Sequence, residues 1–276
     1  MREIIADRKD PQPDEFTPVT PDRLWLWGGP TPSWGGSMAP DCLVREKSLG
    51  NENAIYVYGA TTPEAIGMCS GYKKLLCQVN SNCRTQGMLK GSEEENAELL
   101  SKLSLEYPNI TGAICDDFST GFVRTLLPAR YEKIYRGVKK YNDKLKLYGV
   151  VYTHELGKTH FDLIQPYIDV VNLWVWNKEE ILDIDHHVAQ CRKIFPGKSI
   201  LLGLFIHDYG TSDLASPAEL LIYQLKRAGV MLKKNWIEGV VVLGDREIRK
   251  WPRQSEALAK FLKQDQYTLA AGKQIG

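Results

Sequence analysis

Eight short apolar runs separated by helical stretches predict an α/β protein, folded as a single (β/α)8 TIM barrel with a long loop after its first strand. Runs of four to eight residues rich in Val, Ile, Tyr and Trp are typical of buried strands. A chain of 276 residues is of ordinary length for eight strand–helix units. The predicted strands are Arg23–Trp27, Ala54–Tyr58, Lys74–Val79, Thr111–Asp116, Lys146–Thr153, Asp169–Trp176, Ser199–His207 and Glu238–Gly244.

Start signals for helices lie between these runs. Thr62–Glu64 places a capping residue before a proline and an acid, which favour a first helical turn. Ser92 with Glu95 forms a capping box, and Ser216–Glu219 repeats that pattern ahead of another apolar helical stripe. Helices are therefore expected after the second, third and seventh strands. Two longer helical stretches are Phe122–Tyr141 and Lys178–Phe195.

Composition and charge are those of a globular protein without an evident charged partner. Hydrophobic residues make up 43% of the chain and charged residues 25%, and the formal net charge is +1. No strong field favours nucleic acid or a membrane surface, and no apolar stretch approaches the roughly 18 residues of a membrane span. Met1–Pro21 is polar rather than a signal peptide, so we expect a cytoplasmic protein, although a mature exported form would begin in the same way. Oligomeric state is not predicted.

An open doubly wound sheet is the rival architecture. Such a sheet carries a glycine-rich phosphate turn after its first strand, and Gly28-Gly29-Pro30 does not match it. The irregular stretch Gly28–Asn53 is expected to be either a lid over the barrel mouth or a surface loop packed by Trp34. The six cysteines match no zinc-ligand spacing, so neither a metal nor a cofactor is expected. The expected organisation is an N-terminal polar extension over 1–22, the barrel over 23–265 and a C-terminal tail over 266–276.

The end of the fourth strand carries the clearest chemical signal. Because alternate strand residues face the barrel interior, Gly112, Ile114 and Asp116 share one face and Asp116 lies at the inner rim. An inward carboxylate needs a partner or a substrate to offset its desolvation. Asp117 follows on the turn, where it either serves the site or caps and bends the chain. Both acids are therefore candidates for catalysis.

Aromatic side chains gather at the other strand ends. In the sixth strand Asn172, Trp174 and Trp176 share the face opposite the aliphatic one, so they are expected to line the barrel. Aromatic rings stack on the C–H faces of sugars, while their polar tips can still hydrogen-bond. Trp25 and Tyr56 are expected to fill the barrel layers instead. The expected substrate-binding residues are Trp27, Tyr58, Asn80, Trp174, Trp176, His207, Tyr209 and Asp245.

Two carboxyl groups on adjacent strands are placed to act on a glycosidic bond. Such hydrolysis needs a pair that flanks the bond, one member of which is protonated near neutral pH. Asp116 with Glu155 is the preferred pair. Its second member depends on the phase of the fifth strand, which brings either Thr153 and Glu155 or Tyr152 and His154 to the mouth. The catalytic candidates are Asp116, Asp117 and Glu155, and the other acids of this face are Asp208, Asp245 and Glu247.

The segment Gly112–Phe118 resembles the G-x-x-x-D ending of strand four in several families of (β/α)8-barrel glycoside hydrolases, and the face of Asn172, Trp174 and Trp176 adds to the likeness. The resemblance implies a hydrolase acting on glycosidic bonds of an oligo- or polysaccharide. The chain departs from the pattern at two places. No Asn-Glu pair closes strand four, and His207–Tyr209 stands where a glutamate would end strand seven. No specific family's catalytic residues are therefore carried over.

Two other functions fit the same strand ends. The first is a carbohydrate-binding barrel without catalysis, which the aromatic rim would serve equally well. The second is another barrel hydrolase or lyase, such as a metal-dependent one with His154, His207 and Asp245 near the ion. The pair His186-His187 lies in a charged helix and is expected to face solvent. Asp116→Asn separates the first alternative from a hydrolase, because a binding protein tolerates the change.

Overall fold

The structure is a computed structural model that describes residues 11–12, 15–30, 49–80, 91–118, 128–157, 160–208 and 214–272. The side chains of residue 245 and of residues 265–272 lie outside this description. Most of the long loop after the first strand, with Trp34, also lies outside it, as does Tyr209. The expectations for the loop and for Tyr209 therefore remain predictions.

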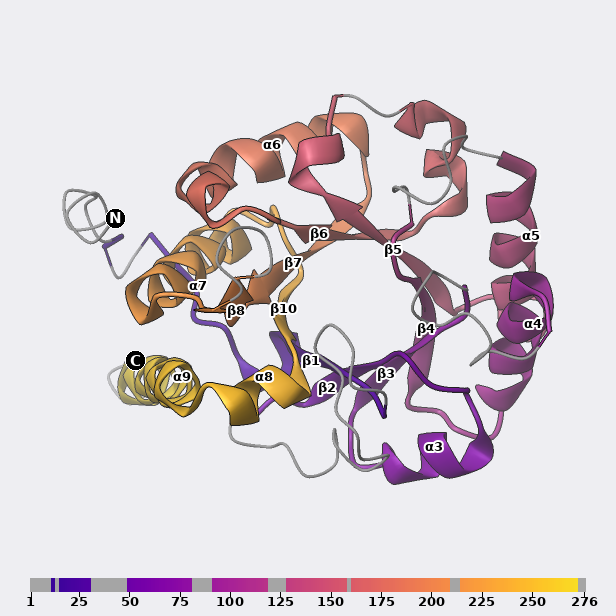
Figure 1. Ribbon diagram of the computed structural model, residues 1–276, viewed down its shortest axis with the longest axis horizontal. Helices are drawn as coiled ribbons and strands as arrows, with labels where there is room; N and C mark the ends of the chain where they lie inside the picture. The colour runs from indigo at the N-terminus through magenta and orange to yellow at the C-terminus, as the bar shows by residue number, and fades with distance from the viewer. Residues whose placement is uncertain are drawn as a thin grey trace.

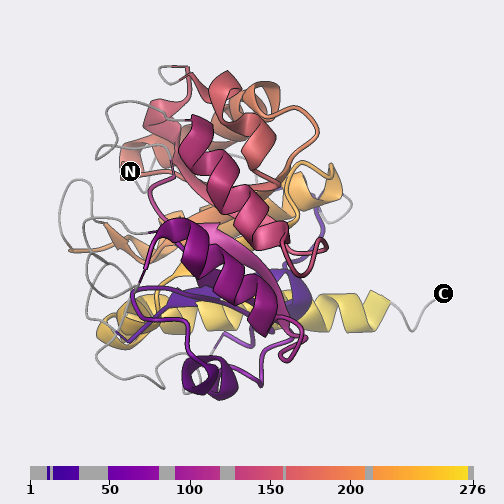
Figure 2. The same ribbon diagram turned by 90° about the vertical axis from the view of Figure 1, so that its right-hand side faces the viewer.

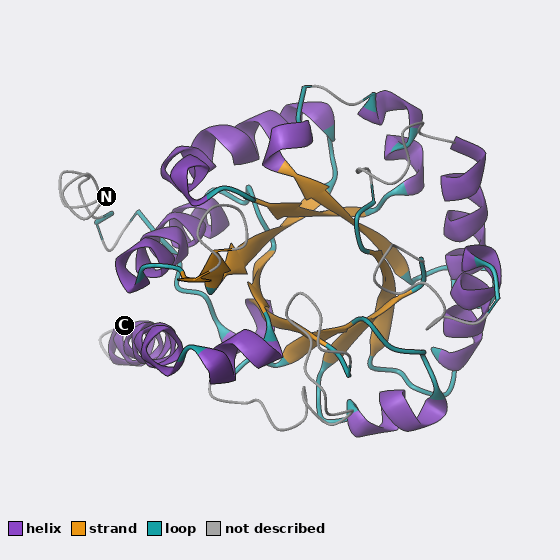
Figure 3. Ribbon diagram, viewed as in Figure 1, coloured by secondary structure: helices purple, strands orange, loops and turns teal. Residues whose placement is uncertain are grey.

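Eight parallel strands close into a barrel, which confirms the predicted fold class and rules out the open doubly wound sheet. Figure 1 looks along the barrel axis, and Figure 3 shows the strands as an inner ring surrounded by helices. Neighbouring strands pair in the order β1-β10-β7-β6-β5-β4-β3-β2. The barrel strands are β1 (Leu24–Gly28), β2 (Asn53–Tyr56), β3 (Lys74–Gln78), β4 (Ile110–Cys115), β5 (Lys146–Tyr152), β6 (Val170–Trp174), β7 (Ser199–Phe205) and β10 (Gly239–Leu243).

The outer layer consists of α-helices and short 3-10 turns. A two-stranded sheet of β8 (His207–Asp208) and β9 (Leu214–Ala215) follows β7. Figure 2 shows that α9 extends past the barrel. The α-helices are α3 (Pro63–Met68), α4 (Glu93–Leu103), α5 (Pro128–Lys139), α6 (Ile184–Ile194), α7 (Ala218–Lys233), α8 (Asp245–Lys250) and α9 (Pro252–Gly272). The 3-10 turns are η1 (Pro21–Arg23), η2 (Thr153–Glu155), η3 (Phe161–Leu163), η4 (Gln165–Tyr167) and η5 (Lys178–Asp183).

Helices begin at all three predicted starts, and two of the three predicted caps are confirmed. The hydroxyl of Thr62 accepts a hydrogen bond from the backbone N–H of Ala65, and Ser92 with Glu95 forms the predicted capping box. The third is wrong, because Pro217 occupies the N-cap position of α7 and no side chain caps the helix. Ser216 stands one residue too early to cap it, and its N–H instead donates to the carbonyl of Ile206 at 2.7 Å.

The two longer helical predictions need adjustment. The predicted helix over 122–141 is α5, which begins at Pro128 where the structure is described. The predicted helix over 178–195 is divided into the 3-10 turn η5 and the α-helix α6. His187 in α6 is half-buried, with a side chain only 15% exposed, so its predicted solvent-facing position is wrong, whereas His186 is exposed as expected.

Strand alternation divides the core into two layers. Side chains such as Leu76, Ile114 and Val241 fill the barrel interior, and Ile114 lies on the face predicted for it. The opposite faces of the same strands, for example Leu173, pack against the helices. Tyr56 belongs to this outer layer, so its predicted place inside the barrel is wrong. Burial of each large apolar side chain contributes about 1.5–3 kcal/mol, which makes these two layers the main source of stability.

The predicted N-terminal segment contacts the barrel in part. Val19 is buried in the outer core layer, and the N–H of Thr17 donates to the carbonyl of Gly229 in α7 at 2.9 Å. At the other end α9 continues through residue 265 to Gly272. Within the described parts of the chain, no helix has the length and apolarity that crossing a membrane requires. Four cysteines are buried free thiols, namely Cys69, Cys77, Cys115 and Cys191.

Candidate functional site

The strand ends meet at the C-terminal mouth of the barrel, where Asp116 follows β4. Asp116 is only 5% exposed. The side chain of Asn80, which follows β3, hydrogen-bonds both the carbonyl and the N–H of Asp116. The Asn80 amide nitrogen donates to the carbonyl of Asp116 at 2.6 Å, and its amide oxygen accepts from the N–H of Asp116 at 2.9 Å. Asn80 was predicted to contact substrate, and here its side chain positions the catalytic candidate.

Asp117 presents its carboxylate beside Tyr152. The hydroxyl of Tyr152 donates to Oδ1 of Asp117 at 2.9 Å, and the N–H of Asp117 donates to Oδ1 of Asp116 at 3.1 Å. Asp117 is half-buried and has a φ of 49°, in the left-handed region that Asp adopts more readily than most residues. Because of this turn, the side chains of Asp117 and Asp116 have different surroundings, although the two residues are adjacent in the chain.

Tyr152 shows which residues of the fifth strand face the barrel. Tyr148 and Val150 lie in the barrel interior, and Tyr152 packs against the same cluster. The alternative with Tyr152 and His154 at the mouth is therefore correct. Burial, together with the neighbouring carboxylates of Asp117 and Asp116, raises the pKa of Tyr152 well above its ordinary value. The phenol consequently stays protonated and acts as a hydrogen-bond donor to Asp117.

Glu155 belongs to the other of the two alternatives for this segment and lies in the turn η2. It is 6% exposed, and its Oε2 accepts the backbone N–H of Tyr152 at 2.9 Å. The carboxylate thereby fixes the turn that follows β5. It is also linked to the Tyr152–Asp117 unit through one hydrogen bond. The pairing of Glu155 with Asp116 in catalysis stays a prediction.

A continuous row of aromatic rings lines the mouth. Consecutive ring centroids are 4.7 to 6.2 Å apart, with tilted or edge-on geometry between neighbours. At one end of the row, the ring of His154 stacks on that of Tyr152 at 5.6 Å. In order, the row consists of Tyr58, Trp27, Trp174, Phe205, Trp176 and Tyr152.

The row has a buried part and an accessible part. Trp27, Tyr58 and Trp174 are each 2% exposed. Their polar atoms have partners within the chain, since Trp27 Nε1–H donates to the Tyr58 hydroxyl and Trp174 Nε1–H donates to Oδ1 of Asn172. These three rings therefore form a floor. Trp176 is half-buried, which leaves part of its ring at the surface for a ligand.

Close packing fixes the ring of Trp174 in this floor. A Cβ atom placed on Gly203 of β7 would lie 2.1 Å from the Trp174 indole, so only glycine leaves room for that ring. The amide nitrogen of Asn172 donates to the carbonyl of Leu201, which anchors the acceptor of the indole N–H. Gly203 of β7 thus provides the space that the large Trp174 ring of β6 occupies.

Tyr58 has an unusual backbone conformation for a large residue. Its φ is 61°, and its N–H donates to the side-chain oxygen of Gln78 at 3.0 Å. Left-handed conformations of bulky residues cost free energy and gather at functional sites. Tyr58 and Asp117 both adopt it, at the ends of β2 and β4, so both strand ends at this mouth are held in strained turns.

The remaining predicted residues on the β7 side have partners of their own. His207 is 1% exposed, and its Nδ1 accepts the indole N–H of Trp251 at 3.0 Å. Asp208 is 3% exposed and forms an ion pair with Lys178 at 2.7 Å. The sequence reasoning did not single out Lys178 or Trp251 as partners. Pairing at this distance follows from folding, because 30 residues separate Lys178 from Asp208.

The last acids lie after β10. Glu247 in α8 is fully buried and accepts a hydrogen bond from Nε of Arg246 at 2.8 Å. Asp245 opens the same helix, and its side chain lies outside the description. Among the side chains that the structure describes, no group of three or more His, Cys, Asp and Glu is arranged to hold a metal ion.

No family model matches the chain, and no curated protein matches its sequence. Solved structures do match its fold. Concanavalin B superposes with a TM-score of 0.55 at 12% identity, covering 87% of this chain and 98% of its own. A xylanase and α-amylase inhibitor protein superposes with a TM-score of 0.53 at 10% identity, covering 87% and 98%. A β-glucuronidase from Ruminococcus gnavus has a TM-score of 0.54 at 7% identity, covering 81% of this chain and 43% of its own. At these identities the likeness establishes the fold alone, a (β/α)8 barrel.

Proposed function

We propose that the chain is a glycoside hydrolase whose site lies at the C-terminal mouth of the barrel. The observation that carries this proposal is the unit of Asp117 and Tyr152, a half-buried carboxylate with a protonated phenol at 2.9 Å. Trp176 extends the unit, with its ring edge-on to Tyr152 at 5.4 Å. A carboxylate beside an accessible aromatic ring is the arrangement that holds a sugar ring and reacts at its anomeric carbon.

Asp117 is proposed as the carboxylate that faces the substrate. Its hydrogen bond from Tyr152 stabilises the negative charge, which suits a nucleophile or a base. Asp116 and Glu155 are the candidates for the second carboxyl group. Each is linked to the Tyr152–Asp117 unit by one hydrogen bond, and each is more than nine-tenths buried.

Turnover of nitrophenyl glycosides and natural oligosaccharides by a set of variants tests the proposal. Asp117→Asn is expected to lower kcat/KM by at least about 100-fold, the usual contribution of a group that transfers a proton or attacks. Asp116→Asn and Glu155→Gln identify the second carboxyl group, which is the one whose loss is comparable. Asp162→Asn, at an exposed acid of η3, serves as the matched control. Full activity of both folded β4 variants would contradict the proposal.

A carbohydrate-binding barrel without catalysis is the second candidate. This function is favoured because two acids at this mouth have structural contacts within the chain. Asp208 pairs with Lys178, and Glu155 accepts a backbone hydrogen bond that fixes a turn. Calorimetric titration with the same oligosaccharides separates the two functions. A binding protein would keep its affinity in Asp117→Asn and lose it in Trp176→Ala, with no turnover by the unaltered chain.

A further inference from the structure

The opposite end of the barrel holds a cavity of about 360 Å³. It is lined at the N-terminal ends of β1, β3, β4 and β5, so the whole length of the barrel interior separates it from the carboxylates of the C-terminal mouth. Trp25 and Tyr148 line it from the interior, with ring centroids 6.3 Å apart. We call it the N-terminal cavity.

Positive charge dominates the wall of the N-terminal cavity. Arg23, Lys74, Lys144 and Lys146 line it, against the two carboxylates of Asp22 and Glu238. Within the described residues none of the four cationic side chains has an ion-pair partner. Some other cations do have ion-pair partners, as in the pairs of Lys139 with Asp169 at 2.9 Å and Lys140 with Glu98 at 2.7 Å.

Two hydroxyl groups in the wall lack partners in the described structure. Thr111 Oγ1 is buried and accepts or donates no hydrogen bond there. Tyr148 is only 4% exposed, and its hydroxyl likewise makes no hydrogen bond to a described residue. Burial, and then the charges of Glu238 and Asp169, raise the pKa of Tyr148, so the hydroxyl stays a donor. A buried hydroxyl without a partner, such as that of Thr111, is costly, and a bound ligand is one way to satisfy it.

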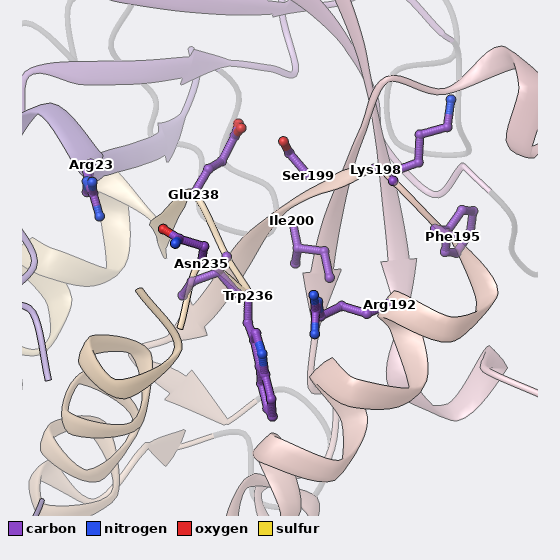
Figure 4. A pocket seen from close by; sticks show the side chains of 11 residues that line it. Arg23, Arg192, Phe195, Lys198, Ser199, Ile200, Asn235, Trp236 and Glu238 are labelled. Atoms are coloured by element: carbon purple, nitrogen blue, oxygen red, sulfur yellow. The ribbon is translucent and has the colours of Figure 1, made fainter. Parts of the chain in front are cut away.

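A second cleft, of about 460 Å³, adjoins the cavity and shares Arg23 and Glu238 with it. Figure 4 shows Arg192 and Trp236 close together in this cleft. The guanidinium carbon of Arg192 lies 5.3 Å from the Trp236 ring centroid, and Lys234 lies 4.8 Å from it. A flat or ring-shaped group can pack at such a surface beside further positive charge.

We propose that the N-terminal mouth binds a small phosphate or sulfate ester, with its oxyanion in the N-terminal cavity and the rest of the molecule directed toward Trp236. Lysine and arginine side chains with hydroxyl donors are the groups that bind such oxyanions. A small ligand fits better than a nucleic acid strand, because the site is a concave cavity rather than an extended basic groove. The site is independent of the chemistry proposed for the other mouth.

Titration calorimetry and thermal unfolding test this site with inorganic phosphate, sulfate, glucose 6-phosphate, glucose 6-sulfate and uncharged glucose. We expect both anionic sugars to bind through the N-terminal cavity and to raise the Tm more than glucose does. The ratio between the two esters shows whether phosphate or sulfate is preferred. A double variant, Lys74→Gln with Lys146→Gln, is expected to weaken binding by about tenfold or more, the effect of removing two charge-assisted contacts.

Two further variants make the result specific. Tyr148→Phe is expected to weaken ester binding severalfold without a change of charge, because it removes the donor alone. The matched control is Lys260→Gln with Lys263→Gln, two exposed lysines of α9, which should leave the affinity unchanged. Absence of binding up to about 10 mM ester, far weaker than a functional site, would overturn the proposal. Equal losses in the control pair, or tighter binding of a single-stranded oligonucleotide through the same lysines, would also overturn it.

Discussion

At the C-terminal mouth of the barrel, charged side chains have partners from the chain itself, whereas at the N-terminal mouth four cations line a cavity without a described counter-ion. Asp117 accepts the hydroxyl of Tyr152, and Asp208 pairs with Lys178. Lys74 and the other cations of the cavity have no equivalent contact among the described residues. The first mouth is therefore organised by contacts within the chain, whereas the second is where we propose that a bound anion supplies the counter-charge.

The difference follows from where each mouth places its side chains. At the C-terminal mouth, turns such as the one at Asp117 bring acids against a buried aromatic floor, and a buried charge without a partner would be costly. At the N-terminal mouth Lys74, Lys144 and Lys146 are exposed, and water can solvate them without a partner. Because hydrated lysine side chains need no ion-pair partner, they remain available to a dissolved anion.

Removal of the floor should have the largest effect on stability. Trp174→Ala is expected to lower the free energy of unfolding by about 3–5 kcal/mol, because it leaves a cavity against Gly203 and removes a ring from the interior. Chemical denaturation measures the change. The matched variant is Trp176→Ala at the accessible part of the row, which should cost clearly less stability and should weaken carbohydrate binding. Equal losses of stability in the two variants would show that Trp174 and Trp176 contribute equally to the fold.

The same substitution at the two mouths should have unequal effects. Lys178→Met leaves the carboxylate of Asp208, which is 3% exposed, without its ammonium partner. We expect it to lower the free energy of unfolding by about 1–3 kcal/mol, the range for leaving a buried acceptor unsatisfied. Lys146→Met removes an exposed cation from a cluster of like charge and should change stability by less than about 0.5 kcal/mol. Chemical denaturation near pH 7 gives both values, and an equal cost at Lys146 would reveal a structural partner for that side chain.

The smallest expected effect concerns His187, beside the C-terminal mouth. Its Nε2 lies 3.9 Å from Glu180, whose carboxylate also accepts the hydroxyl of Thr153. Burial lowers the pKa of His187 below its ordinary value, although Glu180 opposes the shift. The unfolded chain therefore binds more protons than the folded one once the pH falls below the unfolded pKa, about 6.5, so acid weakens the fold in that window.

His187→Gln should remove this contribution. The variant's Tm should fall less than that of the unaltered protein between about pH 8 and about pH 5, the range in which a histidine titrates. His186→Gln, at the exposed neighbour, is the control and should retain the parent's pH dependence. A steeper fall of Tm in His187→Gln would mean that the ion pair with Glu180 outweighs burial.

The alternation of side chains along each strand distinguished the two faces of most strands, but it failed in β5 and at Tyr56. In β5 both faces are apolar, with Leu147 and Val151 on one and Tyr148 and Val150 on the other, so the pattern left the phase open. Packing decided it by placing Tyr148 inside. Tyr56 was misplaced because a single ring at the end of a short strand gives no periodicity to follow.

The N-terminal mouth has a signature in the sequence. Three predicted strands begin at a basic residue, namely Arg23, Lys74 and Lys146. In a closed parallel barrel all strand beginnings meet at one end, so residues far apart in the chain become neighbours. Because the strands are parallel, residues at strand ends gather at one mouth and residues at strand starts gather at the other. The acids therefore meet at the C-terminal mouth and these cations at the N-terminal mouth.

The sequence by itself determined the barrel, the positions of its eight strands, three helix starts and the placing of Asp116 and Asp117 after β4. These features depend on periodicity and capping, which act over a few residues of chain. Only the tertiary structure decided that Tyr152 hydrogen-bonds Asp117, that Asn80 holds Asp116, and that Lys178 pairs with Asp208. Each of these contacts joins segments about 30 residues or more apart, and closure of the barrel sets which strand ends come within hydrogen-bond distance.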